Sequence, residues 1–191
     1  MSTMTEMPEL MTTEQLLALP DDGIDRELIH GRLQEMPMTR RNWRHSRTEA
    51  SIAAVLNAWS RQQPAPRGEV LSGEAAFRIL RNPDTTVGID VAYISAEQAQ
   101  SNPRDAFILE GPPVLAVEVL SPSDVQERLI GKIQDYLDGG VKLIWIVEPV
   151  FRTVTVYRPD AKPALFNDAQ EIIADTHLPG FRVPVASLFG L

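Results

Sequence analysis

The feature that most constrains the fold is a nearly continuous apolar segment, 114–120, that contains one carboxylate. The segment reads Val-Leu-Ala-Val-Glu-Val-Leu, and Glu118 is its only charged residue. An apolar run of this length is typical of a strand that is buried on both faces. An ionised carboxylate in such a strand is strongly unfavourable unless a cation or hydrogen-bond donors compensate it. The sequence therefore predicts an internal strand whose acid has a specific partner.

A second segment, 87–94, repeats this pattern with Asp90 as its only charged residue. In both segments the residue two positions before the acid is small and lies on the same face, Gly88 before Asp90 and Ala116 before Glu118. A structural role, in which arginine or backbone amides hold the carboxylate, explains either acid alone. Two such acids on successive strands favour a divalent cation with oxygen ligands, and Mg²⁺ is the natural candidate.

A lysine in the next segment completes the pattern. Residues 124–138 have the apolar spacing of an amphipathic helix that stops at Gly139-Gly140. Lys132 falls on the border of the apolar stripe, from which its side chain can reach the end of the preceding strand. Such a lysine more commonly covers the edge of the core with its stem and keeps its ammonium in water. Beside two buried carboxylates, contact with a phosphate or an attacking water is the competing interpretation.

Composition narrows the class of protein. The chain has 191 residues, no cysteine and a net charge of −8, and we expect one domain, 1–191. The absence of cysteine excludes disulfides, zinc–thiolate sites and thiol catalysis. Because the first residues also have no signal-peptide pattern, we expect a cytoplasmic protein, and no apolar stretch is long enough to span a membrane. The net charge of −8 disfavours an extended nucleic-acid-binding surface, but it does not exclude binding through a local basic patch.

The arrangement of expected elements predicts an α/β (α+β) domain with a mixed central sheet flanked by helices. Helices are expected at 12–19, 44–63 and 124–138, a hairpin at 26–36, strands at 69–80, 87–94, 114–120, 141–147 and 153–158, and one or two short strands in the tail. Thr12 with Gln15, and Ser123 with Gln126, have the spacing of capping boxes. A cluster of arginines opens the second helix, at positions 40, 41, 44 and 47, and indicates either a phosphate-binding patch or a solvated helix start.

Other catalytic classes lack their patterns. No histidine spacing typical of a zinc site, no glycine-rich phosphate loop and no Gly-x-Ser-x-Gly turn occur in the sequence. The order of Asp90, Glu118 and a lysine in the following helix instead resembles the PD-(D/E)XK nuclease superfamily. More narrowly, the chain resembles the Uma2 family of restriction-endonuclease-like proteins. The resemblance is carried by 26–33, by His45 and the helix behind it, by Val-Glu-Val-Leu-Ser-Pro-Ser-Asp at 117–124, and by Lys132 with 136–142 and 145–147.

Two departures from the superfamily pattern concern single positions. Ile89 precedes Asp90 where the superfamily has proline, and Leu120 stands where it has the lysine. In the Uma2 pattern the role of that lysine moves to Lys132. The resemblance implies a metal-dependent endonuclease that hydrolyses phosphodiester bonds of DNA. Asp90 and Glu118 would bind Mg²⁺ (or Mn²⁺), with the Val119 carbonyl as a further ligand, and Lys132 would orient the attacking water or offset phosphate charge.

The resemblance adds two further residues whose roles stay open. Glu27 would contribute another acid beside the metal, or it is an exposed strand residue paired with Arg26. His45 would polarise a phosphate or water, or it caps its helix. Because clustered carboxylates repel one another, at least one of Asp90, Glu118 and Glu27 should have a raised pKa, and we expect Asp90→Asn to stabilise the metal-free protein.

The rival class is a nuclease-like fold that acts as a DNA- or protein-binding module without turnover. The net charge of −8 and the missing lysine at Leu120 favour this alternative. The presence of Asp90, Glu118 and Lys132 favours the enzyme. A nuclease that cuts duplex DNA is often a two-fold dimer, so a homodimer is the assembly we expect for that substrate.

Overall fold

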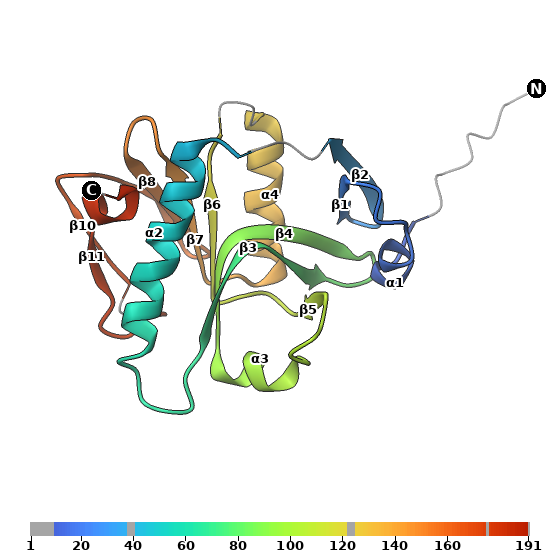
Figure 1. The fold of residues 1–191 in the computed structure, drawn as a ribbon, viewed down its shortest axis with the longest axis horizontal. Coiled ribbons are helices and arrows are strands. Elements are labelled where there is room, and N and C mark those ends of the chain that lie inside the picture. The colour runs from blue at the N-terminus through green and yellow to red at the C-terminus, as the bar shows by residue number, and fades with distance from the viewer. Residues whose placement is uncertain (1–9, 38–40, 122–124, 175, 191) are drawn as a thin grey trace, which may run out of the picture.

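The computed structural model describes residues 10–37, 41–121, 125–174 and 176–190 (Figure 1). In this part of the chain helices flank a large mixed sheet, which confirms the predicted fold class. The helices are α1 (Thr13–Leu17), α2 (Trp43–Ser60), α3 (Ala96–Ser101) and α4 (Gln126–Gly139), with a 3₁₀ helix η1 (Val185–Phe189). The strands are β1 (Ile24–Ile29), β2 (Arg32–Pro37), β3 (Glu69–Leu80), β4 (Thr85–Ile94), β5 (Ile108–Glu110), β6 (Leu115–Val119), β7 (Leu143–Glu148), β8 (Thr153–Arg158), β9 (Ala161–Asn167), β10 (Glu171–Ile173) and β11 (Arg182–Pro184). None of the helices in these ranges is long and apolar enough to cross a membrane.

The strand β4 organises the sheet, whose order is β2-β1-β4-β6-β7-β8-β9. β3 pairs with β4 along nearly all of its length, so β1 and β6 must share the other edge of β4. On that edge β1 pairs at Thr86, and β6 pairs antiparallel at 91–93. Within the described residues, no strand pairs with this edge of β4 over 87–90, and Asp90 lies in that interval.

The two long helices lie on opposite faces of the sheet, as Figure 1 shows for α2 and α4. Successive residues of a strand point to opposite faces. Even-numbered residues of β6 and β7, such as Ala116, Ile144 and Ile146, pack with Ile133 and Tyr136 of α4. Odd-numbered residues of the same strands, such as Val117, Trp145 and Val147, pack with Ile52 and Leu56 of α2 and with Leu188 of η1. Burial on both faces explains why these strands are apolar without alternation.

Several local predictions are confirmed. Thr12 caps α1 in a capping box with Gln15. The β1–β2 hairpin turns at His30 and Gly31, whose φ angles are 51° and 74°. Gly140 ends α4 in the left-handed conformation, with φ of 96°.

Two predictions had another outcome. The capping box of Ser123 and the expected helix start at 124 lie outside the described residues, and α4 begins at Gln126. The tail contains more than the one or two short strands expected, because β9 extends the main sheet while β10 and β11 form a second, two-stranded sheet.

Candidate functional site

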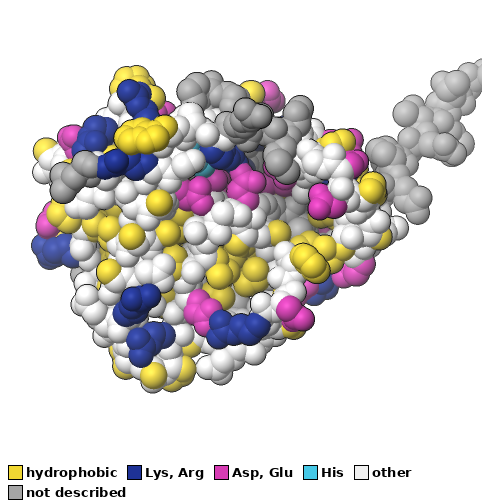
Figure 2. Space-filling model, in the orientation of Figure 1, with side chains coloured by type: hydrophobic (Ala, Val, Ile, Leu, Met, Phe, Trp, Pro, Cys, Tyr) yellow, Lys and Arg dark blue, Asp and Glu magenta, His cyan; other side chains and the backbone are white. Residues whose placement is uncertain are grey.

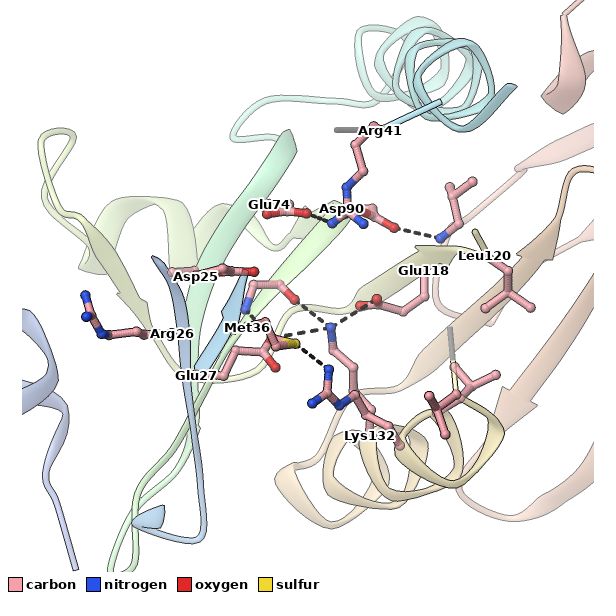
Figure 3. Close-up of a pocket in the computed structure, with 16 residues that line it drawn as sticks. Asp25, Arg26, Glu27, Met36, Arg41, Glu74, Asp90, Glu118, Leu120 and Lys132 are labelled. Atoms are coloured by element: carbon pink, nitrogen blue, oxygen red, sulfur yellow. Dashed lines mark hydrogen bonds and ion pairs between the residues drawn. The ribbon is translucent and has the colours of Figure 1, made fainter. Parts of the chain in front are cut away.

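A cavity of about 350 Å³ opens beside the interval of β4 that no strand covers. Its lining includes Glu27, Arg41, Glu74, Gly88, Asp90, Glu118, Val119 and Lys132. These residues come from β1, the segment before α2, β3, β4, β6 and α4. In Figure 3 the Glu118 carboxylate and the Lys132 ammonium point toward each other inside the cavity. Figure 2 shows Asp and Glu side chains gathered around a hollow on this face of the molecule.

Asp90 and Glu118 line this cavity from β4 and β6, which pair antiparallel at 91–93. The Asp90 carboxylate lies against His45 of α2, and the Glu118 carboxylate lies against Lys132 and Tyr136 of α4. The Asp90 side chain also takes over a strand hydrogen bond, since its Oδ2 accepts from the Val119 N–H at 2.7 Å.

The environment of Asp90 favours its ionised form. Asp90 is only 5% exposed, and burial alone would raise the pKa of its carboxyl group. The contact with His45, the hydrogen bond from Val119 and the charge of Arg41 outweigh burial and hold the pKa of Asp90 below its usual value. This direction is opposite to the one on which the expectation for Asp90→Asn was based, so Asp90→Asn is now expected to destabilise the metal-free protein near neutral pH.

Glu118 has the opposite character. Tyr136 Oη donates to its Oε1 at 2.5 Å, and Lys132 Nζ donates to its Oε2 at 3.1 Å. Burial, with a further contribution from the charge of Asp90, nevertheless raises the pKa of Glu118 to about 7. The prediction that one of the clustered acids has a raised pKa is confirmed by Glu118. A cation in the cavity would favour its ionised form.

Lys132 lies between two acids and a carbonyl. Its Nζ is 3.0 Å from Gly88 O, 3.1 Å from Glu118 Oε2 and 3.5 Å from Glu27 Oε1. Burial would lower the pKa of Lys132, but the charges of Glu118 and Glu27 outweigh it and raise the pKa. The side chain is therefore an ammonium whose position is fixed inside the cavity, rather than one that extends into water.

Glu27 belongs to the cavity and not to an exposed face. Its residue is 9% exposed, and its Oε1 accepts from the Gly88 N–H at 3.1 Å. Arg26 instead pairs with Asp22 at 2.8 Å and with Glu35 at 2.9 Å. The alternation of side chains along β1 sends Arg26 and Glu27 to opposite faces. The interpretation of Glu27 as a partner of Arg26 is therefore wrong.

His45 does not cap its helix. The N-cap of α2 is Asn42, whose side chain accepts from the His45 N–H at 3.0 Å. The His45 imidazole is buried, with Nε2 at 3.4 Å from Asp90 Oδ2 and Nδ1 at 3.9 Å from Glu49 Oε2. Of the two interpretations left open, capping by the side chain is excluded, and the imidazole lies against the acids.

The arginine cluster divides in the structure. Arg41 pairs with Glu74 and lies 3.8 Å from Asp90 Oδ1, so it belongs to the cavity. Arg47 stacks on the exposed Trp43 ring, with 5.0 Å between guanidinium carbon and ring centroid. Arg44 is exposed, and position 40 lies outside the described residues. One arginine of the cluster therefore contributes to the site.

Sequence reasoning did not assign a role to Tyr136, which holds Glu118, or to Glu74, which lines the cavity. Tyr136 follows Lys132 by four residues on α4 and thus shares its face, but its ring reads as part of the apolar stripe. Glu74 reaches the cavity because β3 bulges between Ser72 and Ala75, where Gly73 and Glu74 have φ of 84° and 59°. A glycine inside a predicted strand is a signal for such a bulge.

A sequence model of the Uma2 family, described as "Putative restriction endonuclease", matches residues 13–186, and the chain belongs to this family. A solved structure described as "a putative nuclease belonging to DUF820" from Anabaena variabilis superposes with a TM-score of 0.76. The likeness covers 94% of this chain and 97% of that chain at 22% identity, so it is a likeness of fold. No curated protein matches the chain significantly.

Proposed function

We propose that the protein is a metal-dependent endonuclease that hydrolyses phosphodiester bonds of DNA. The observation that carries this proposal is the meeting of Asp90, Glu118 and Lys132 in one cavity, from three elements that are separate in the sequence. Glu27 also faces this lysine, so the three acids Asp90, Glu118 and Glu27 lie in the same cavity. The family description supports the same class of reaction.

The donor set fits a hard divalent cation. Asp90 and Glu118 offer carboxylate oxygens, and Val119 lines the same cavity with its backbone beside them. We propose that these residues hold Mg²⁺ (or Mn²⁺), which take oxygen ligands of this kind. When bound, such an ion lowers the pKa of a coordinated water and offsets charge on the scissile phosphate.

The remaining residues position and compensate charge. Gly88 O and Glu27 fix Lys132 Nζ so that its ammonium can orient the attacking water or donate to a phosphate oxygen. Tyr136 holds one oxygen of Glu118 by its hydroxyl, which directs the other oxygen toward the cavity. Glu27 is thereby a positioning residue, since it acts through the lysine.

A nicking assay tests this function. The full-length protein is incubated with supercoiled plasmid and with single-stranded DNA, with Mg²⁺ or Mn²⁺, at low salt because an acidic protein binds DNA weakly. We expect metal-dependent cleavage that Glu118→Gln eliminates. Glu127→Gln is the matched control, because Glu127 is exposed and does not line the cavity, and the substitution makes the same chemical change.

Two results would contradict the endonuclease. One is the lack of metal-dependent cleavage of either substrate by the wild type, and the other is equal cleavage by Glu118→Gln. The protein would then be better described as a DNA- or protein-binding module. If duplex DNA is the substrate, sedimentation should detect the homodimer that a cut of both strands favours.

A further inference from the structure

One buried side chain near the cavity has ring nitrogens that face carboxylates at long distances. His45 is 1% exposed, and neither ring nitrogen makes a hydrogen bond of normal geometry with the described residues, although Nε2 lies 3.4 Å from Asp90 Oδ2 and Nδ1 lies 3.9 Å from Glu49 Oε2. Buried polar atoms in folded proteins nearly always have a hydrogen-bond partner, so these long contacts need an explanation. The nitrogens face carboxylates rather than apolar groups, so the imidazole and the carboxylates could bind one cation together.

The imidazole has two carboxylates as neighbours. One ring nitrogen and one oxygen each from Glu49 and Asp90 lie within 4.8 Å of one another. Glu49 follows His45 by one helical turn, and Gly73 N–H donates to its Oε1 at 2.8 Å, which fixes the carboxylate. Asp90 is fixed in turn by the Val119 N–H. Three ligand atoms are thus held together from two elements, α2 and β4.

We propose that His45, Glu49 and Asp90 bind a divalent cation that accepts imidazole nitrogen, such as Mn²⁺ or Zn²⁺, in preference to Mg²⁺. Two ligands at about 2.1 Å from one tetrahedral ion lie about 3.4 Å apart, and His45 Nε2 is 3.4 Å from Asp90 Oδ2. A nitrogen ligand selects against Mg²⁺, which takes oxygen ligands. This site shares Asp90 with the proposed Mg²⁺ site, but its other two ligands differ, and it does not depend on cleavage.

A proton is the competing explanation. An imidazolium between Glu49 and Asp90 would satisfy both nitrogens without any metal. The two explanations differ in whether Mn²⁺ can bind at this position. A metal site binds Mn²⁺ through nitrogen, whereas an imidazolium excludes a cation from the same position.

Pulsed electron paramagnetic resonance of Mn²⁺ bound to the full-length, metal-stripped protein separates these explanations. We expect coupling of the bound Mn²⁺ to an imidazole ¹⁴N in the wild type and in Glu118→Gln, where the proposed Mg²⁺ site has lost a ligand. The coupling should disappear in His45→Gln. His30→Gln is the matched control, because His30 also contacts a carboxylate, Asp135 at 2.8 Å, but lies outside the cluster.

A second variant keeps the test independent of the buried histidine. Glu49→Gln retains an oxygen for the Gly73 N–H, and its side chain is 19% exposed, so the fold should persist. We expect the Mn²⁺ affinity of this variant, measured in the Glu118→Gln background, to fall at least about tenfold. Equimolar Mg²⁺ should not displace the Mn²⁺.

Three results would overturn the proposal: absence of ¹⁴N coupling in the wild type, its persistence in His45→Gln, or displacement of Mn²⁺ by equimolar Mg²⁺. If His45→Gln does not fold, an unchanged Mn²⁺ affinity in Glu49→Gln overturns it as well. Failure of the nuclease assay with ¹⁴N coupling present would refute the proposed function alone. Cleavage without ¹⁴N coupling would refute this site alone.

Discussion

Arg78 on β3 contacts three carboxylates, and Lys132 on α4 contacts two carboxylates in a cavity that a third acid, Asp90, also lines. Arg78 of β3 contacts Glu110 through two nitrogens, Glu14 Oε1 at 2.6 Å and Asp84 Oδ2 at 3.3 Å. The cation is 7% exposed in this cluster. By composition alone the Arg78 cluster resembles the cavity around Lys132, yet the two differ in the supply of hydrogen-bond donors.

In the Arg78 cluster the acids receive enough donors. Asp84 accepts from the Thr13 N–H and Oγ as well as from Arg78, and together these outweigh the effect of burial and lower its pKa. Glu14 and Glu110 remain partly in water, with exposed fractions of 68% and 46%. The guanidinium offers five N–H donors in a fixed plane. Arg78 and Thr13 therefore compensate the one buried acid of this cluster, Asp84, without any further cation.

In the cavity the acids are more deeply buried and have fewer donors. Lys132 has three N–H donors, and one of them is used by Gly88 O. Glu118 retains a raised pKa even with Lys132 and Tyr136 as partners. A cluster of charges is therefore recognised as a candidate site when its buried carboxylates lack enough positive charge, and not by its composition.

The largest expected effect concerns the structural cluster. Arg78→Met should lower the free energy of unfolding by about 3–5 kcal/mol, because it leaves buried Asp84 without its cation. Urea denaturation at pH 7 measures this change. Arg81→Met is the control, since Arg81 contacts the same Glu110 but is 58% exposed and should change stability by less than about 1 kcal/mol. Equal losses in the two variants would contradict the view that Arg78 stabilises the protein by compensating buried Asp84.

The second prediction uses the opposite pKa shifts of two acids. The pKa of Glu118 rises from 4.5 to about 7 on folding, so Glu118 makes the metal-free protein less stable as pH rises through this window. At about 1.4 kcal/mol per pH unit the loss is on the order of 3 kcal/mol. Glu118→Gln should remove it and flatten the pH dependence between pH 4.5 and 7, as urea denaturation in EDTA measures.

Asp84→Asn is the control, because the pKa of Asp84 shifts in the opposite direction to that of Glu118. The pKa of Asp84 is lowered on folding, so its contribution is present above the unfolded pKa and is lost as pH falls through the folded pKa. This variant should be less stable than the wild type at pH 7 and approach it in acid. If both substitutions change the pH dependence in the same direction, the contrast between the clusters is refuted.

The sequence predicted much of the fold and the centre of the site, for identifiable physical reasons. Lone acids in apolar strands are conspicuous, so Asp90 and Glu118 could be found without a structure. The bulge that turns Glu74 inward depends on pairing between β3 and β4, which no local pattern specifies. The sign of the Asp90 pKa shift likewise depends on His45 and Val119, which approach it only in the folded chain.

The third prediction concerns Lys132. Lys132→Met should reduce cleavage about 10²-fold, which corresponds to about 2.7 kcal/mol of transition-state stabilisation. Its effect on stability at pH 7 should be smaller than that of Arg78→Met, because Glu118, with a pKa of about 7, can take up a proton when the ammonium is removed. Nicking assays and urea denaturation measure the two effects. Lys142→Met, at an exposed position, is the control, and cleavage by Lys132→Met within threefold of this control would exclude a catalytic lysine.

The smallest expected effect is at Gly88, the small residue two positions before Asp90. A Cβ at Gly88 would meet Glu74 Cβ and O at 3.5 Å, which is ordinary contact. Gly88 serves the cavity through its backbone, whose N–H donates to Glu27 and whose O accepts from Lys132. Gly88→Ala should therefore change stability by less than about 1 kcal/mol and leave metal-dependent cleavage within a few-fold of the wild type.

A second glycine provides the contrast for this measurement. A Cβ at Gly68 would lie 2.1 Å from Ile94 O, so Gly68→Ala requires the backbone to move and should destabilise the protein well beyond Gly88→Ala. Thermal melts and nicking assays of both variants are compared with the wild type. A large loss of cleavage in Gly88→Ala with an unchanged melting temperature would mean that open space beside Asp90, rather than the balance of donors and charge, makes this cluster a site.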